Sequence, residues 1–212
     1  MPSRGRFPWV NKMSPSSVTP RNVLFLLASS REGGNAEQLA RKAAEALPPG
    51  TVTDWLRLED SLVEPFRDLR HAPGGYTRPP PPELLALAER TLAADEVVIV
   101  APVYWYNLPS TALAYLEHWS WWMRVPELRF AERMRGKVLS LVTAHSSEED
   151  DSVATPSLMS LRMSADYLEM RWRGGLIGHG NRPGEVLQDT RALSAAREFL
   201  VRPLSVAKVE AA

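Results

Sequence analysis

Glu96-Val97-Val98-Ile99-Val100-Ala101 is the clearest buried strand in the sequence. A short, continuous apolar run of this kind is typical of a strand covered on both faces by helices, so we expect it in the middle of a parallel sheet. Before it, apolar residues recur at helical spacing over 83–94, where a run of prolines fixes the helix start. After it, Pro109 opens a second helix that the same spacing carries to about Met123.

The same alternation of strand and helix extends in both directions from this centre. We expect further strands at 23–28, 51–58, 137–142 and 171–178, and helices at 35–47, 157–169 and 183–200. Strand and helix alternating five times predict an α/β fold, a doubly wound five-stranded parallel sheet with helices on both faces. Ligands of such sheets bind at the carboxyl ends of the strands, so the loops after the first, third and fourth strands become the candidate site.

Length and composition fit one domain. The chain has 212 residues, of which 44% are hydrophobic and 24% charged, enough apolar side chain for one core. We assign residues 1–21 to a flexible tail and 22–212 to the domain, and Met13 is an alternative start to Met1. Residues 59–82 are rich in prolines and charged residues and form a long, irregular connection, a kind of loop that is often functional.

Several classes of protein are disfavoured. Lys plus Arg equals Asp plus Glu at 25 each, so no net field draws the chain to nucleic acid. Cysteine is absent, which removes disulfides, thiolate catalysis and Cys-ligated metals. The longest apolar run, residues 97–103, is too short for a membrane span, and the N-terminus lacks the pattern of a signal peptide. We therefore expect a cytoplasmic protein.

The loop after the first strand has the composition of a phosphate site. Ser29-Ser30-Arg31-Glu32-Gly33-Gly34-Asn35-Ala36 brings hydroxyls, a guanidinium and the free amides of a helix N-terminus together. The loop matches neither the Walker motif nor the Gly-x-Gly-x-x-Gly fingerprint. The alternative is a polar turn in which Asn35 only caps the helix.

The loop after the third strand is aromatic. It reads Pro102-Val103-Tyr104-Trp105-Tyr106-Asn107, and three consecutive aromatic residues at a strand end favour stacking on a planar ring. A subunit interface, which is also rich in Tyr and Trp, is the rival interpretation.

The loop after the fourth strand contains a lone histidine and four acids. In Thr143-Ala144-His145-Ser146, His145 is placed to donate a hydrogen bond to an anionic cofactor edge, or is an ordinary exposed histidine. Residues 148–151 are all acidic and favour a solvated cluster or a helix start over a metal site, because no His or Cys partner accompanies them at metal-ligand spacing. We expect no metal.

These loops resemble those of the flavodoxin-like NADPH-dependent FMN reductases and NAD(P)H:quinone oxidoreductases, over about residues 21–200. The most specific parts are Ser29-Ser30-Arg31-x-x-Gly34-Asn35-Ala36 and Ala94-Asp95-x-Val97-Val98-x-x-x-Pro102-Val103-Tyr104-Trp105, with Gly184-Glu185-Val186 as a looser match. The resemblance implies that the FMN phosphate is held by Ser29, Ser30, Arg31, Asn35 and Ala36. It implies that the flavin ring is held by Pro102, Val103, Tyr104, Trp105, Tyr106, Asn107, Thr143, Ala144, His145 and Ser146.

The sequence also departs from the family pattern. Leu113 stands where the family often has Lys, Glu117 where it often has Asp, and Ala144-His145 where a Gly often follows the Thr. The last change would narrow the pocket or shift the ring edge, so inference about the substrate is weaker than inference about the flavin.

The implied activity is hydride transfer from NAD(P)H to FMN and electron transfer onward to a quinone, a flavin or a similar small acceptor. Backbone amides of the aromatic loop would stabilise the reduced flavin, and no catalytic acid or base is nominated. The alternatives are a flavodoxin-type electron carrier and a flavin-free regulatory or interaction protein.

The tryptophan content of the helix that begins at Pro109 leads us to expect a homodimer or homotetramer. Trp119, Trp121, Trp122 and Met123 lie within five residues, more apolar surface than one helix face can bury, and homodimers of the family often complete the active site across the interface.

Overall fold

The computed structural model describes residues 21–62, 64–76, 78–147 and 150–204. Five strands form one parallel sheet: β1 (Asn22–Leu27), β2 (Val52–Arg57), β3 (Glu96–Pro102), β4 (Val138–His145) and β5 (Arg171–His179). Their spatial order is β2-β1-β3-β4-β5. The predicted doubly wound five-stranded parallel sheet is confirmed. β3 is its central strand, and all but the last of its residues are buried.

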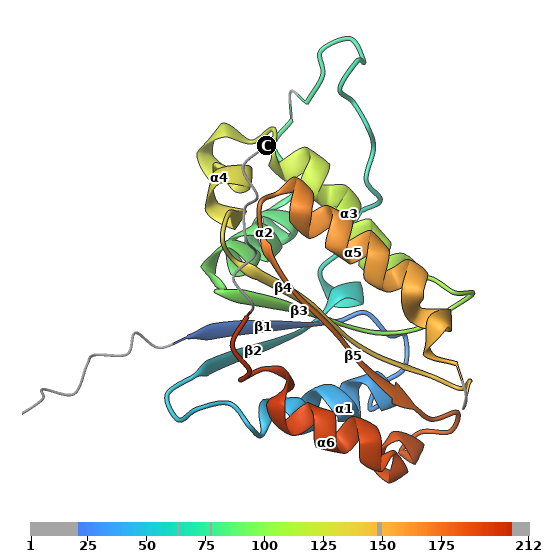
Figure 1. Ribbon diagram of the computed structural model, residues 1–212. Helices are drawn as coiled ribbons and strands as arrows, with labels where there is room; N and C mark the ends of the chain where they lie inside the picture. The colour runs from blue at the N-terminus through green and yellow to red at the C-terminus, as the bar shows by residue number, and fades with distance from the viewer. Residues whose placement is uncertain (1–20, 63, 77, 148–149, 205–212) are drawn as a thin grey trace, which may run out of the picture.

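Helices cover both faces of the sheet (Figure 1). Helices α1 (Asn35–Ala44) and α6 (Thr190–Phe199) pack on one face, and α2 (Pro82–Ala93), α3 (Ser110–Trp122) and α5 (Thr155–Tyr167) on the other. Two clusters of buried apolar residues, one on each face, form the core. The strand order reverses between β1 and β3, which places the topological switch point beside the carboxyl ends of these two strands.

The structure differs from the sequence prediction mainly at four places. The fourth strand runs on to His145 because Ala101–Pro102 and Ile177–His179 pair with it on either side. The last helix begins only at Thr190, where the Asp189 carboxylate caps it, and a separate 3-10 turn occupies Glu185–Gln188. The first helix ends at Ala44. A short helix, α4 (Phe130–Met134), was not predicted, since five residues are too few to show a period.

The tryptophans of α3 are part of the core of this chain. Trp119, Trp121 and Trp122 are 5%, 6% and 0% exposed. Trp122 packs edge-on to Tyr115, with ring centroids 5.7 Å apart, and Tyr76 from the proline-rich connection lies 5.9 Å from Trp121. The premise that one helix carries more tryptophan than the monomer can bury was therefore wrong, because the connection and α4 supply the missing cover.

Two sequence predictions remain, the N-terminal tail and the lack of a membrane span. The predicted tail lies outside the described residues up to residue 20, and Arg21 already donates a hydrogen bond to the Leu200 carbonyl. No helix within the described ranges is long and apolar enough to cross a membrane.

Candidate functional site at the carboxyl ends of the strands

A cavity of about 230 Å³ opens at the carboxyl edge of the sheet, beside the switch point. It joins all three loops that the sequence singled out, together with the loop after β5. The lining residues are Ser29, Arg31, Gly34, Asn35, Ala36, Glu37, Pro102, Val103, Tyr104, Ala144, His145, Ser146, Gly180 and Asn181.

Some predicted site residues lie elsewhere. Thr143 is buried inside β4, between Ala101 and Ile177 of the neighbouring strands. Ser30, Trp105, Tyr106 and Asn107 are exposed and do not line the cavity.

The sequence analysis missed Glu37, Gly180 and Asn181 among the lining residues, and it quoted Gly34 in the loop motif without naming it as a binding residue. Gly180 and Asn181 follow β5 directly, so the rule that ligands bind at strand ends would have found them had it been applied to the fifth strand too.

The N-terminus of α1 is open toward the cavity. Its N-cap is Gly34, which has no side chain to cap the helix, and the first helical hydrogen bond runs from the Gln38 N–H to the Gly34 carbonyl at 3.0 Å. The amides of Asn35, Ala36 and Glu37 precede that bond and lack helical partners. With Ser29 and Arg31 on the same wall, these donors and the positive end of the helix dipole suit a phosphate group.

A buried carboxylate braces this loop. Glu37 is 8% exposed and accepts hydrogen bonds from the Gly33 N–H (3.0 Å) and from Arg41 (2.7 Å). Arg57 lies 3.4 Å from the same carboxylate and also donates to the Ser29 carbonyl at 3.0 Å. Burial alone would raise the pKa of Glu37, but the hydrogen bonds from Arg41 and Gly33 outweigh it and hold the pKa below its usual value. Two arginines therefore neutralise the carboxylate, and it does not oppose an anion in the cavity.

The Asn35 side chain does not cap the helix. Its amide donates to the Arg182 carbonyl at 3.0 Å, and its oxygen accepts the Gly184 N–H at 2.9 Å. A Cβ at Gly180 would lie 2.7 Å from this amide nitrogen, so only glycine fits there. The capping alternative for Asn35 was wrong: the side chain fastens the turn after β5 to α1, and only its backbone N–H is left to meet a phosphate.

The aromatic loop is a tight hairpin. The Tyr104 N–H donates to the Asn107 carbonyl at 2.9 Å, and the Asn107 N–H returns a bond of 3.0 Å. Trp105 and Tyr106 form the two-residue tip, and only Tyr104 lines the cavity. We had expected backbone amides of this loop to stabilise a reduced flavin. The N–H groups of Tyr104 and Asn107 are not available for this, because each already donates a hydrogen bond within the hairpin.

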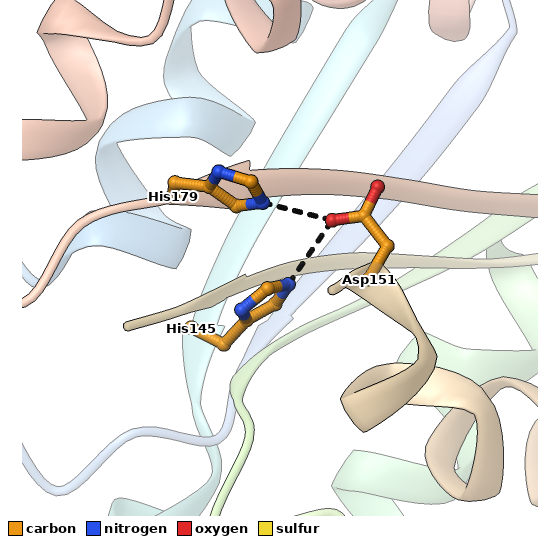
Figure 2. A group of neighbouring side chains, drawn as sticks. All are labelled: His145, Asp151 and His179. Atoms are coloured by element: carbon orange, nitrogen blue, oxygen red, sulfur yellow. Dashed lines mark hydrogen bonds and ion pairs between the residues drawn. The ribbon is translucent and has the colours of Figure 1, made fainter. Parts of the chain in front are cut away.

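His145, Asp151 and His179 converge at the end of β4 and β5 (Figure 2). Oδ1 of Asp151 lies 3.2 Å from His145 Nε2 and 2.9 Å from His179 Nε2. Arg191 of α6 donates to Oδ2 at 2.6 Å. The hydrogen bond from Arg191 is the main reason why the pKa of Asp151 lies well below its usual range, so the carboxylate stays ionised.

The hydrogen bonds fix the state of His145. Its Nδ1 accepts the Ser147 N–H at 3.2 Å, so the proton of the neutral ring lies on Nε2 and faces Asp151. Burial is the main cause that lowers the pKa of His145, with the Asp151 hydrogen bond acting against it. Both ring nitrogens are therefore engaged, and the predicted hydrogen bond from His145 to a cofactor edge is not available in this arrangement.

The cluster also corrects the interpretation of the acidic run. Glu148 and Glu149 lie outside the described residues, but Asp151 does have histidine partners, contrary to the sequence analysis. The three side chains are close enough to surround a cation, since their ligand atoms lie within 4.8 Å of one another. Two features favour a hydrogen-bonded clasp instead: His145 turns an N–H rather than a lone pair inward, and Arg191 already neutralises the carboxylate.

Comparison with known proteins gives a consistent family. A family model described as NADPH-dependent FMN reductase matches residues 21–171. A putative NAD(P)H-dependent FMN-containing oxidoreductase of Bacillus subtilis is 30% identical over 180 residues, which cover 85% of this chain and 97% of that protein.

Solved structures share the fold. The Trp repressor binding protein from Bacillus subtilis has a TM-score of 0.68 at 24% identity, covering 85% of this chain and 99% of that one. The NAD(P)H:quinone oxidoreductase from Methanothermobacter marburgensis has a TM-score of 0.61 at 19% identity, covering 87% and 99%.

Proposed function

Because the chain belongs to the NADPH-dependent FMN reductase family and is an FMN-dependent NAD(P)H oxidoreductase, we propose that the cavity beside α1 is its FMN site. The observation that carries this proposal is the uncapped N-terminus of α1, which opens into a cavity that Arg31 also lines. These are the donors that a phosphate monoester requires, and a flavin is otherwise held mainly by apolar and aromatic contacts.

The lining residues divide into two groups on this proposal. The amides of Asn35 and Ala36, with Ser29 and Arg31, hold the phosphate. Pro102, Val103, Tyr104 and Ala144 form the walls beside the ring, and the clasp of His145 keeps the β4 wall against β5. On this proposal Glu37 does not bind the phosphate itself. It keeps the phosphate-binding loop in shape.

The chemistry that FMN supplies when bound is acceptance of a hydride from the nicotinamide and release of two electrons to an acceptor. For a quinone the balance is NAD(P)H + H⁺ + quinone → NAD(P)⁺ + hydroquinone. The protein binds and orients the partners, and we assign no acid or base to the described residues that line the cavity. A quinone is the acceptor we propose, since the aromatic hairpin borders the cavity.

The first experiment is the visible spectrum of the protein after FMN is added and the excess removed, followed by NADPH or NADH without oxygen. Retained flavin that bleaches with a nicotinamide and recovers with a quinone supports the proposal. Retained flavin that bleaches only with dithionite favours an electron carrier, and no retained flavin contradicts the assignment of the cavity.

We still propose a homodimer, but the support for it is a set of exposed residues on α5 and not the tryptophans of α3. Met159, Met163 and Tyr167 are 50%, 65% and 75% exposed and follow one another at four-residue spacing on α5. Such a stripe lies on one face of a helix and is typical of an interface. Sedimentation of the FMN-loaded protein tests it, and a strict monomer at micromolar concentration contradicts it.

A further inference from the structure

The proline-rich connection between β2 and α2 forms a loop with contacts of its own. Within residues 64–76 the Tyr76 hydroxyl accepts the Leu69 N–H at 3.1 Å, and the Gly75 N–H donates to the Ala72 carbonyl at 2.9 Å. Figure 1 shows this loop projecting beyond the helices on its face of the sheet. Compact loops of this kind are frequently functional, yet none of residues 64–76 lines the flavin cavity.

The C-terminal half of α3 anchors the loop at two points. His118 Nε2 lies 3.1 Å from the Glu64 carbonyl oxygen, and the Phe66 ring meets the His118 ring edge-on with centroids 6.0 Å apart. At the other end of the loop the Tyr76 ring lies 5.9 Å from that of Trp121. The space between the loop and the helix is therefore bounded by contacts on both sides.

A cavity of about 470 Å³ lies between the loop and α3. Its volume falls within the ~300–1,000 Å³ typical of small-molecule sites, and it shares no lining residue with the flavin cavity. Trp121, which lines it, is roughly 16 Å along the helix axis from Ser110 at the start of α3. Because Ser110 follows the aromatic hairpin, the two cavities lie at opposite ends of this helix.

The lining of the second cavity is apolar at its base and cationic at its rim. Trp121 is buried and forms the base, and Tyr76 and Leu69, which are half-buried, form the sides. Arg67 and Arg78 also line the cavity and are exposed, so they lie at its rim. This lining suits a ligand with an aromatic body and a negatively charged end.

The charges around the cavity leave an excess of positive charge. Glu64 is the acid among the described lining residues, and Arg78 binds both of its oxygens through Nη2, at 2.8 and 3.1 Å. A guanidinium carries further donors on its other two nitrogens. Arg67 adds a second cation, and Arg124 lies over the Tyr76 ring at 5.8 Å. Three arginines near one glutamate favour a carboxylate, which an arginine can bind through two parallel hydrogen bonds.

We propose that the cavity between residues 64–76 and α3 is a second ligand site, which binds a small aromatic carboxylate. The aromatic body lies against Tyr76 and Leu69, and Arg67, with the remaining donors of Arg78, binds the carboxylate. The site goes beyond the proposed function, because its residues are separate from those of the flavin cavity.

Calorimetry of the FMN-loaded protein with 2-naphthoate tests the site, and 2-naphthalenemethanol is the uncharged probe of similar shape. Arg67→Gln should weaken 2-naphthoate binding about tenfold and change the affinity for the alcohol by about twofold at most, because only a charged hydrogen bond is lost. Arg67→Lys keeps the charge but not the planar fork, so its affinity for 2-naphthoate should fall between those of the wild type and Arg67→Gln.

Arg70→Gln is the matched control. Arg70 belongs to the same loop, but its Nε donates to both oxygens of Asp68 at 2.9 Å and it does not line the cavity. Both probes should bind this variant as they bind the wild type. Because Arg67 and Arg70 are both exposed, the two glutamine variants should also keep the thermal unfolding midpoint of the wild type.

Leu69→Trp tests where the aromatic body lies. The larger side chain fills the apolar part of the cavity, so both probes should bind about fivefold more weakly or worse. The visible spectrum of the bound flavin should not change when 2-naphthoate is added, since the two cavities share no lining residue.

Four results would overturn the second site. They are no binding of 2-naphthoate to the wild type, equal affinity for the acid and the alcohol, unchanged binding in Leu69→Trp, and binding that alters the flavin spectrum and is insensitive to Arg67→Gln. The last result would place the probe in the flavin cavity. If the protein retains no flavin, the assignment of the flavin cavity fails, and the same titrations of the flavin-free chain still decide the second site.

Discussion

At the scale of single residues, we expect Arg31 to be the side chain whose charge distinguishes FMN from riboflavin. It lines the cavity beside the open end of α1, and a charged hydrogen bond to phosphate contributes ~1.5–3 kcal/mol. We expect Arg31→Ala to weaken FMN binding about tenfold or more and to leave riboflavin binding unchanged. Lys42→Ala is the control, since Lys42 lies further along the same helix in an exposed pair with Glu45. Fluorescence titration measures both ligands, and equal losses for FMN and riboflavin would contradict the role.

His145 makes stability depend on pH. Because burial lowers its pKa in the folded state, the unfolded chain binds the proton more readily, so His145 contributes stability above about pH 6.5 that is lost as the pH falls through the folded pKa. Protonation would also put a proton on Nδ1, opposite the Ser147 N–H. Thermal unfolding between pH 5 and 7.5 should show a weaker acid loss in His145→Gln than in the wild type. Parallel curves for the two proteins would show that the ring does not titrate as its burial requires.

At the scale of elements, one buried carboxylate holds three strands together at the amino edge of the sheet. Glu96 of β3 is fully buried and accepts two hydrogen bonds from Arg173 of β5 (2.7 and 2.8 Å) and one from Ser140 of β4 (2.9 Å). Breaking a buried pair from one side leaves a charge without compensation and costs ~3–5 kcal/mol. We expect Glu96→Gln to lower the free energy of unfolding by that amount in urea titrations, with FMN affinity unchanged.

An exposed ion pair serves as the control for Glu96→Gln. Glu169 and Arg135 lie 2.7 Å apart with side chains 64% and 63% exposed. An exposed pair contributes at most ~1 kcal/mol. A similar loss from Glu169→Gln and Glu96→Gln would refute the special role of the buried carboxylate.

The order and type of the long elements could be predicted because their patterns are local. The apolar run of β3 and the helical spacing of α2 are both visible within about twelve residues. Contacts between distant residues were not visible. Asp151 meets His179 across 28 positions, and Asn35 meets Gly184 across 149, so no spacing rule could join them. The hairpin tip was missed for another reason, since aromatic residues at positive φ contradict the turn preferences that sequence reading relies on.

At the scale of the whole molecule, the cavity joins loops that follow four of the five strands. A ligand bound there contacts segments that separate when the chain unfolds, so it stabilises the fold as a unit. At a free concentration one hundred times the dissociation constant, that linkage contributes ~2.7 kcal/mol. For a domain of this length the midpoint should rise by about 5–10 °C with FMN.

The proposed phosphate site makes this last prediction specific. The donors at α1 are separate from the walls that we propose face the ring, so at equal concentration riboflavin should raise the midpoint less than FMN does. In Arg31→Ala the difference between the two flavins should shrink, because only the phosphate end has lost a partner. Scanning fluorimetry at matched flavin concentrations measures both shifts. If riboflavin stabilises the wild type as much as FMN, the open end of α1 is not a phosphate site, whatever the cavity holds.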